Sequence, residues 1–254
     1  MLIKMIFSQV EEMLEENGVV EAVIGRKTAA VQLTNGGIGT AFVLNEEITE
    51  DDVASSFADM AKGERAVDVA KWALEPEEHI LRRTLALAVI NACAFSQELV
   101  GEELEAAFSV DVGEDDVVGC VGLVRPLIAE MKKKAKRVIA YDKGREGEKQ
   151  PLETQDELLP SCDVVFITGS TFINNTIDHL LSLCDNAREI VIVGPTTPMF
   201  PKAYEGTNVT MLSGGVWKQE MGADIFETIA FGEGVPKLTP YLNKKSIRVK
   251  APSV

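Results

Sequence analysis

The chain has 254 residues, of which 46% are hydrophobic and 26% charged, so it can bury a sizeable core in one large or two medium domains. Its 40 acidic and 25 basic residues give a net charge of −15, which repels phosphate backbones and anionic lipids and argues against nucleic-acid and membrane partners. No uncharged run is as long as a membrane span, and the four cysteines lack CxxC spacing, so we expect a cytoplasmic protein with reduced thiols.

The first part of the chain predicts an amphipathic helix followed by β-strands. Apolar residues recur at helical spacing over residues 2–16, and the Asn-Gly pair that ends at Gly18 is a typical helix end. Two β-rich runs follow, 19–33 and 38–44, and the sequence Asn35-Gly36 between them is a strong hairpin signal.

Helices are expected after the hairpin. Thr49 to Asp52 resembles a capping box, with Asp in place of the usual Glu, and predicts a helix start. Residues 66–74 predict a short helix, and Pro76 stands where proline is favoured, in the first turn of a long helix that runs through Phe95. Residues 1–110 are therefore expected to form an α+β domain.

Beyond residue 110 the pattern changes to strands that alternate with helices. Alternation at this spacing implies βαβ units, a parallel sheet and right-handed crossovers, so residues 111–254 are expected to form an α/β domain. The predicted strands are 117–121, 138–141, 164–168, 190–193 and 209–212.

Glycines stand at the ends of four of these strands, and their recurrence indicates a ligand site. In an open parallel sheet the ligand lies beyond the carboxyl ends of the strands, near the point where strand order reverses. The segment from Asp163 to Cys184 runs from a buried strand through Gly169 and a polar loop into a helix, which would turn backbone N–H groups towards a polar or anionic ligand. The other three strand ends carry Gly122, Gly194 and Gly214.

Asp142 ends the second strand of the α/β domain, twenty residues after Gly122. An acid at this place in a nucleotide-binding βαβ unit accepts hydrogen bonds from ribose hydroxyls. The turn from Gly119 to Pro126 is not GxGxxG, however, and the chain has no GxxxxGK[ST] sequence. The signal for NAD is therefore weak.

Direct metal binding has little support in the sequence. The two histidines, His79 and His179, have no cysteine or second histidine at ligand spacing, so no metal-ligating residues are predicted. We expect His179 to be a half-exposed surface residue and His79 to lie at a solvated helix start.

The run TGSTFINNTIDHLL, with VGPTTPMFP and MLSGGVW after it, resembles a prokaryotic family of unknown function that is described as putative heavy-metal chelation proteins. The segments RKTAAVQLTNGGIGTAF and RRTLALAVINA are similar to the first domain of that family, so the resemblance covers nearly the whole chain. It implies that residues 1–110 are like the amino-terminal domain of enolase and that residues 111–254 form a Rossmann-like domain.

The resemblance also implies a ligand in the cleft between the two domains and a role in making or handling metal chelators. We expect backbone N–H groups at Gly169 to Thr171 and at Gly194 to Thr196 to face anionic groups, Asn174 to orient the ligand and Asp142 to bind hydroxyls. The residues that the resemblance places on the cleft wall are Gly122, Gly169, Ser170, Thr171, Asn174, Gly194, Pro195, Thr196 and Gly214.

The expected ligand is a polar small molecule: a nucleotide, a pterin, a flavin-like compound, or a metal chelator or its precursor. Any metal would enter with a chelator rather than in a protein cage. One alternative is a transferase, lyase or oxidoreductase that uses S-adenosylmethionine or NAD, and another is a non-catalytic sensor of a metal chelate. Whether the protein is an enzyme, and whether it forms a homo-oligomer, is left open.

Overall fold

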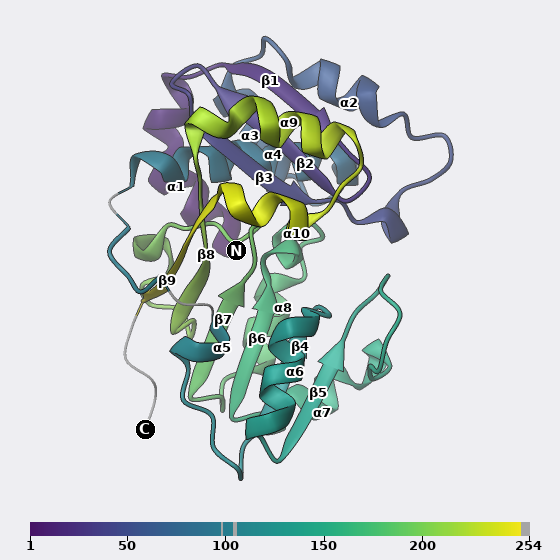
Figure 1. Ribbon diagram of the computed structural model, residues 1–254, viewed down its shortest axis with the longest axis vertical. Coiled ribbons are helices and arrows are strands. Elements are labelled where there is room, and N and C mark those ends of the chain that lie inside the picture. Colours follow the sequence, from purple (N-terminus) through teal and green to yellow (C-terminus); the bar gives the residue numbers. More distant parts are fainter. Residues whose placement is uncertain (98, 104–105, 250–254) are drawn as a thin grey trace.

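The computed structural model describes residues 1–97, 99–103 and 106–249. Within these residues the strands form two sheets (Figure 1), one of three strands in the order β1-β2-β3 and one of six in the order β5-β4-β6-β7-β8-β9. None of the described helices combines the length and the apolar character needed to cross a membrane.

The three-stranded sheet is antiparallel, and helices pack on it. The predicted hairpin is confirmed: Gly36 in its turn has φ +87, a conformation that glycine adopts without strain. The run 19–33, however, is two strands joined by a short turn. The elements of this half are α1 (Leu2–Glu15), β1 (Val19–Ile24), β2 (Thr28–Leu33), β3 (Ile38–Phe42), α2 (Ala54–Ala61), α3 (Ala66–Ala70) and α4 (Ile80–Ala92).

Two helices of this half begin later than the sequence predicts. The N–H and hydroxyl of Thr49 donate to Asp52 Oδ2 at 2.8 and 3.1 Å, but this is an isolated turn and α2 begins only at Ala54. Pro76 likewise lies before α4, whose amino end is capped by His79: its Nδ1 accepts the N–H of Leu81 at 3.2 Å. At Thr49 and at Leu81 a side chain accepts a local backbone N–H, but at Thr49 no helix follows directly.

The six-stranded sheet confirms the predicted parallel arrangement. Strands β4 to β8 are parallel, and β9 pairs antiparallel with β8 at the edge. The chain steps from β4 outward to β5 and then returns to β6 on the other side of β4, so strand order reverses between β4 and β6. The elements are α5 (Ala106–Ser109), β4 (Val117–Val121), α6 (Arg125–Lys134), β5 (Arg137–Tyr141), α7 (Gln155–Leu158), β6 (Val164–Thr168), α8 (Ile177–Leu183), β7 (Glu189–Val193), β8 (Met211–Trp217) and β9 (Leu242–Arg248).

Short 3-10 turns join these elements. They are η1 (Asn45–Glu47), η2 (Lys71–Leu74), η3 (Cys93–Ser96), η4 (Leu152–Thr154), η5 (Leu159–Ser161), η6 (Gly169–Phe172), η7 (Pro201–Tyr204), η8 (Gln219–Met221) and η9 (Thr239–Tyr241).

The chain returns to the first sheet near its carboxyl end, which the sequence did not predict. After β8, helix α9 (Gly222–Ala230) lies over β1 to β3 (Figure 1). Ile225 and Ile229 of α9 share a buried cluster with Ala30 and Ile38 of the first sheet. Helix α10 (Val235–Leu238) follows α9, and Leu238 of α10 belongs to the same buried cluster. Ala29 and Val31, the neighbours of Ala30 in β2, belong instead to the larger buried cluster that contains α4. Successive residues of a strand point to opposite faces, so α4 and α9 cover opposite faces of this sheet. A domain boundary near residue 110 stays a prediction.

Candidate functional site

A cavity of about 1110 Å³ lies at the carboxyl ends of the parallel strands. Its walls include the carboxyl ends of β4 to β7, and the first half of the chain contributes residues such as Lys27, Phe42 and Leu44. Val235 and Pro236 of α10 also line it. The predicted fifth strand, 209–212, is β8 and continues to Trp217, so Ser213 and Gly214 line the cavity from within a strand and not from beyond its end. The volume is slightly above the usual range of small-molecule sites, about 300 to 1,000 Å³.

The cavity lies where strand order reverses. Gly122 follows β4 with φ +101, and a Cβ atom there would stand 2.8 Å from Cγ2 of Thr168, the last residue of β6. The absence of a side chain at this position therefore lets the two strand ends approach. This is the place at which open α/β sheets bind ligands.

Nine of the ten residues that the sequence indicated line this one cavity. The exception is Gly169, which packs against the next loop: a Cβ atom there would stand 2.6 Å from the backbone nitrogen of Thr197. Whether the nine bind a ligand stays a prediction. They are Gly122, Asp142, Ser170, Thr171, Asn174, Gly194, Pro195, Thr196 and Gly214.

The loops after β6 and β7 offer fewer N–H groups than expected. The N–H of Gly194 donates to the carbonyl of Ser213 at 2.9 Å, and Pro195 has no N–H. The N–H of Ser170 points to the hydroxyl of Thr168 at 3.5 Å. In addition, α8 begins at Ile177 and not at residue 174 as predicted. The anion binding expected of these two loops would therefore have to come from their remaining N–H groups or from other parts of the cavity wall.

The hydroxyl groups of the first loop are also engaged. Thr171 Oγ1 donates to the carbonyl of Thr168 at 2.8 Å, and Ser170 Oγ lies 3.1 Å from Thr168 Oγ1. The serine hydroxyl can still turn towards a ligand, because either oxygen of that pair can be the donor.

Asn174 links the two halves of the molecule beside the cavity. Its Nδ2 donates to Glu47 Oε1 at 3.2 Å, and the same oxygen accepts Lys143 Nζ at 2.8 Å. Its Oδ1 accepts the hydroxyl of Thr176 at 2.8 Å. Both ends of the amide are therefore held, which fixes the orientation of this side chain.

Asp142 joins two strand ends through backbone N–H groups. Its Oδ2 accepts the N–H of Leu123 at 2.7 Å, and its Oδ1 accepts those of Gly144 and Arg145 at 3.1 and 2.7 Å. The carboxylate thus fixes the turn after β4 against the loop after β5. Binding of ribose hydroxyls stays a prediction, and it would use the remaining lone pairs of a carboxylate that is already bonded.

Thr196 connects the cavity wall to the first half of the chain. Its hydroxyl accepts the N–H of Phe42 at 3.0 Å. Its carbonyl accepts Nδ2 of Asn91 at 3.1 Å, and this amide also donates to the carbonyl of Thr40 at 2.9 Å. The sequence indicated Thr196 but not Phe42 or Asn91, because nothing local to those residues signals a partner more than a hundred positions away.

The two histidines lie on different helices, His79 at the amino end of α4 and His179 on α8. Nε2 of His79 is 2.8 Å from Asp52, and its ring stacks on Phe57 with the centroids 4.4 Å apart. His179 is a surface residue, as predicted, with its side chain 58% exposed and Nε2 3.0 Å from Asp156. No group of three or more His, Cys, Asp or Glu residues in the described part of the chain is placed to hold a metal ion.

Comparison with known proteins identifies relatives for both halves. Residues 7–94 and residues 105–248 match two family profiles, each described as "Putative heavy-metal chelation". An uncharacterized protein of Methanocaldococcus jannaschii is 31% identical over 148 residues, which are 53% of this chain and 54% of that protein. The match therefore spans about half the length of each.

Two solved structures have the same fold. A protein of unknown function from Desulfitobacterium hafniense is 23% identical with a TM-score of 0.76, and the match covers 96% of this chain and 98% of that one. Another, from Pyrococcus horikoshii, is 21% identical with a TM-score of 0.82 and coverage of 98% and 100%. The predicted fold class, an α/β protein in which a smaller α+β unit precedes a mostly parallel sheet, is confirmed.

Proposed function

The chain belongs to the family described as putative heavy-metal chelation proteins, and from this premise we propose that it binds a polar small molecule in the cavity between its two halves. The ligand is a metal chelator or its precursor, or a nucleotide-, pterin- or flavin-like compound. The protein acts in metal homeostasis or in chelator biosynthesis.

One observation carries this proposal. Nine of the ten residues indicated by the sequence and by the family resemblance line a single cavity at the point where strand order reverses. Apolar side chains such as Phe42, Leu123 and Val193 give the cavity a wall on which an organic ring can pack, and polar groups lie beside them.

The available side chains favour a metal that arrives with its own ligands. Within the described residues the histidines, cysteines and acids do not assemble a three-ligand group, and the four cysteines are buried. A heavy-metal ion bound by the protein alone needs such a group. The donor atoms would therefore belong to the small molecule.

Native mass spectrometry of the gently purified protein tests the proposal. The wild type should retain an organic molecule, alone or with a metal. Val235→Trp places a large side chain in the cavity wall and should abolish retention, because Val235 lines the cavity and is only half-buried. Phe231→Trp is the matched control, since Phe231 is 78% exposed on the same carboxyl-terminal segment and lies outside the cavity.

Three outcomes distinguish the hypotheses. A retained nucleoside mass would favour the enzyme that uses S-adenosylmethionine or NAD. A retained chelate that the protein does not consume would favour the sensor. A stoichiometric metal with no organic molecule, or equal retention by Val235→Trp and Phe231→Trp, would contradict binding of an organic ligand in this cavity.

A further inference from the structure

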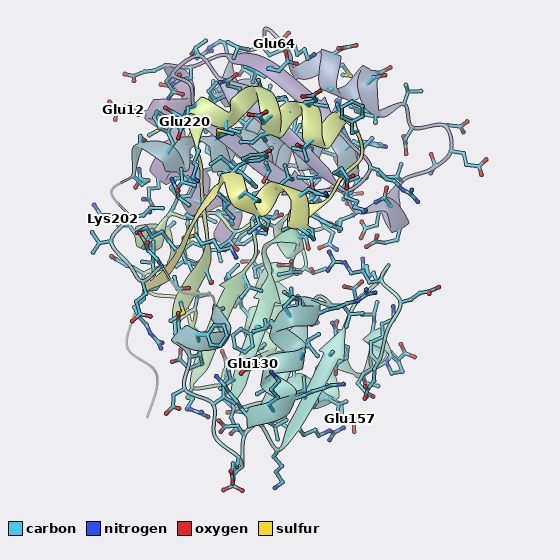
Figure 2. The ribbon with its side chains drawn as sticks, viewed as in Figure 1. Glu12, Glu64, Glu130, Glu157, Lys202 and Glu220 are labelled. Atoms are coloured by element: carbon cyan, nitrogen blue, oxygen red, sulfur yellow. The ribbon has the colours of Figure 1, made fainter. Side chains whose placement is uncertain are left out.

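The charge of the cavity differs from the charge of the whole chain. The chain has 40 acidic and 25 basic residues. Acids such as Glu12, Glu64 and Glu157 project outward from the surface (Figure 2). The cavity, in contrast, is lined by five cationic and three acidic side chains, which are Lys27, Arg125, Lys143, Arg145 and Lys244 against Glu46, Glu130 and Asp142.

Two of the three acids already have partners. The carboxylate of Asp142 accepts three backbone N–H groups, and Glu130 pairs with Lys133 outside the cavity at 2.8 Å. Glu46 is the third acid, and its carboxylate lies against Gly144. Among the cations, Lys143 is paired with Glu47 at 2.8 Å, so the two arginines carry the argument.

Arg125 and Arg145 brace two neighbouring loops reciprocally. Arg145 Nη1 donates to the carbonyl of Leu123 in the turn after β4, at 2.8 Å. Arg125 Nη2 donates to the carbonyl of Glu146 in the loop after β5, at 3.3 Å. Each guanidinium thus reaches into the segment that carries the other, and both groups lie at the same corner of the cavity.

Both guanidinium groups keep donors for a ligand. Neither has a carboxylate at ion-pair distance among the described residues; their partners are carbonyl oxygens and, for Arg145, the ring of Phe42 at 4.9 Å. A guanidinium has five N–H donors in a planar fork, so one hydrogen bond leaves the others available. The fork matches the oxygens of a phosphate or a carboxylate.

From this arrangement we infer that the ligand of the cavity carries an anionic group, a phosphate or a carboxylate, that is held by Arg125 and Arg145. The inference rests on the proposed function, because it names the chemical class of the molecule in that cavity. The body of the ligand packs on the apolar wall, and its anionic end lies at the corner between the turn after β4 and the loop after β5.

Isothermal titration of the dialysed protein with pyrophosphate and with citrate tests the inference, with sodium chloride at equal ionic strength as the blank. The wild type should bind at least one of the two anions. Arg125→Gln and Arg145→Gln should each weaken that binding about tenfold or more, the loss expected for one charge-assisted hydrogen bond. Tighter binding of pyrophosphate identifies a phosphate group, and tighter binding of citrate identifies a carboxylate.

Arg137→Gln is the matched control. Arg137 begins β5 at the end of the strand away from the cavity, and its side chain is exposed. This variant loses the same charge and should bind as the wild type does. The melting temperature without anions shows whether Arg145→Gln has loosened the loop after β5. Arg125 is exposed and makes one long hydrogen bond, so Arg125→Gln should have the melting temperature of the wild type.

Two results would overturn the inference. One is no binding of either anion by the wild type, and the other is equal affinity in Arg125→Gln and Arg137→Gln. If the native mass spectrum then still shows a retained neutral molecule, the proposed function stands and only the anionic group is wrong. If the spectrum shows no organic molecule and the titration shows no anion binding, both proposals fail.

Discussion

Arg188 donates from both terminal nitrogens to the carboxylate of Asp116, at 2.8 and 2.6 Å. Asp116 precedes β4 and Arg188 precedes β7, so the pair ties the amino ends of two strands at the edge of the sheet opposite to the cavity. The hydrogen bonds from Arg188 lower the pKa of Asp116 below its ordinary value of 3.8; burial opposes this shift, and the N–H of Gly113 adds to it.

We expect the pair of Asp116 and Arg188 to make the free energy of unfolding depend on pH in the acid range. A carboxylate whose pKa is lower in the folded state gives stability that is fully present above its unfolded pKa and is lost as the pH falls through its folded pKa. Between about pH 5 and pH 3, the free energy of unfolding of Asp116→Asn should therefore fall less than that of the wild type, because Asn does not titrate. Urea unfolding at several pH values measures the difference.

Asp115→Asn is the control for this experiment. Asp115 is the exposed neighbour of Asp116. The free energy of unfolding of Asp115→Asn should change with pH as that of the wild type does. If Asp116→Asn has the wild-type pH dependence too, then the bidentate pair with Arg188 does not contribute in the way its geometry indicates.

The cysteines should not react in the folded protein. Burial is the largest cause that raises the pKa of each thiol to about 12, so the reactive thiolate is scarce. Iodoacetamide at about pH 8 should leave the native chain unmodified and add four groups in denaturant, as measured by intact mass. The thiols are those of Cys93, Cys120, Cys162 and Cys184.

Ser182→Cys provides the positive control for alkylation, because Ser182 is exposed on α8. Its thiol should be modified in the native protein within minutes to hours, while the four natural thiols stay intact. Rapid native modification of any natural cysteine would show that its surroundings open more often than their packing indicates.

The contact between α4 and β3 depends on Gly39. A Cβ atom there would stand 2.0 Å from the carbonyl oxygen of Ala88 and 2.2 Å from the backbone nitrogen of Ala92. These are backbone atoms of a buried helix and cannot move singly, so Gly39→Ala should lower the free energy of unfolding by about 3 kcal/mol. Gly18→Ala, whose nearest contacts would be at 3.5 and 3.6 Å, should stay within about 1 kcal/mol of the wild type. Equal melting of the two variants would contradict the close packing.

The hydroxyl of Thr196 should stabilise the joint between the two halves. Thr196→Val keeps the shape of the side chain but leaves the N–H of Phe42 without its acceptor, at a cost of about 1 to 3 kcal/mol. Thr196→Ser keeps the hydroxyl and should lose less. Urea unfolding compares the three proteins, and a Val variant as stable as the Ser variant would show that water replaces the lost bond.

Much of the second sheet could be predicted because its strands are apolar along their whole length. Strand β6 has the predicted bounds: its buried run lies between Asp163 and Gly169, and both ends are visible locally. Strand β9 could not be predicted in this way, since Leu242–Arg248 is largely polar and pairs only along one edge of β8. Helix α9 does carry a signal, Ile225 and Ile229 at helical spacing, but the sheet that it covers lies nearly two hundred residues earlier.

The position of the candidate site could be predicted better than its bonds. Carboxyl ends of parallel strands meet at one edge, and this rule alone brought Gly122, Ser170 and Gly194 to one cavity. The sequence could not show which N–H groups remain available to a ligand. The N–H of Gly194, for example, donates to the carbonyl of Ser213 on the neighbouring strand. Lys27 and Phe42 were missed for a similar reason: they reach the cavity from the other half of the chain.

The return of α9 to the first sheet separates the order of synthesis from the order of assembly. The ribosome releases β1 to β3 early, while Ile225 and Ile229, which cover Ala30 and Ile38, emerge only near the end of the chain. Until then this face of the sheet is open to water. A nascent chain halted after β8 therefore exposes an apolar surface to chaperones and to other nascent chains, although every strand of its first sheet has already been made.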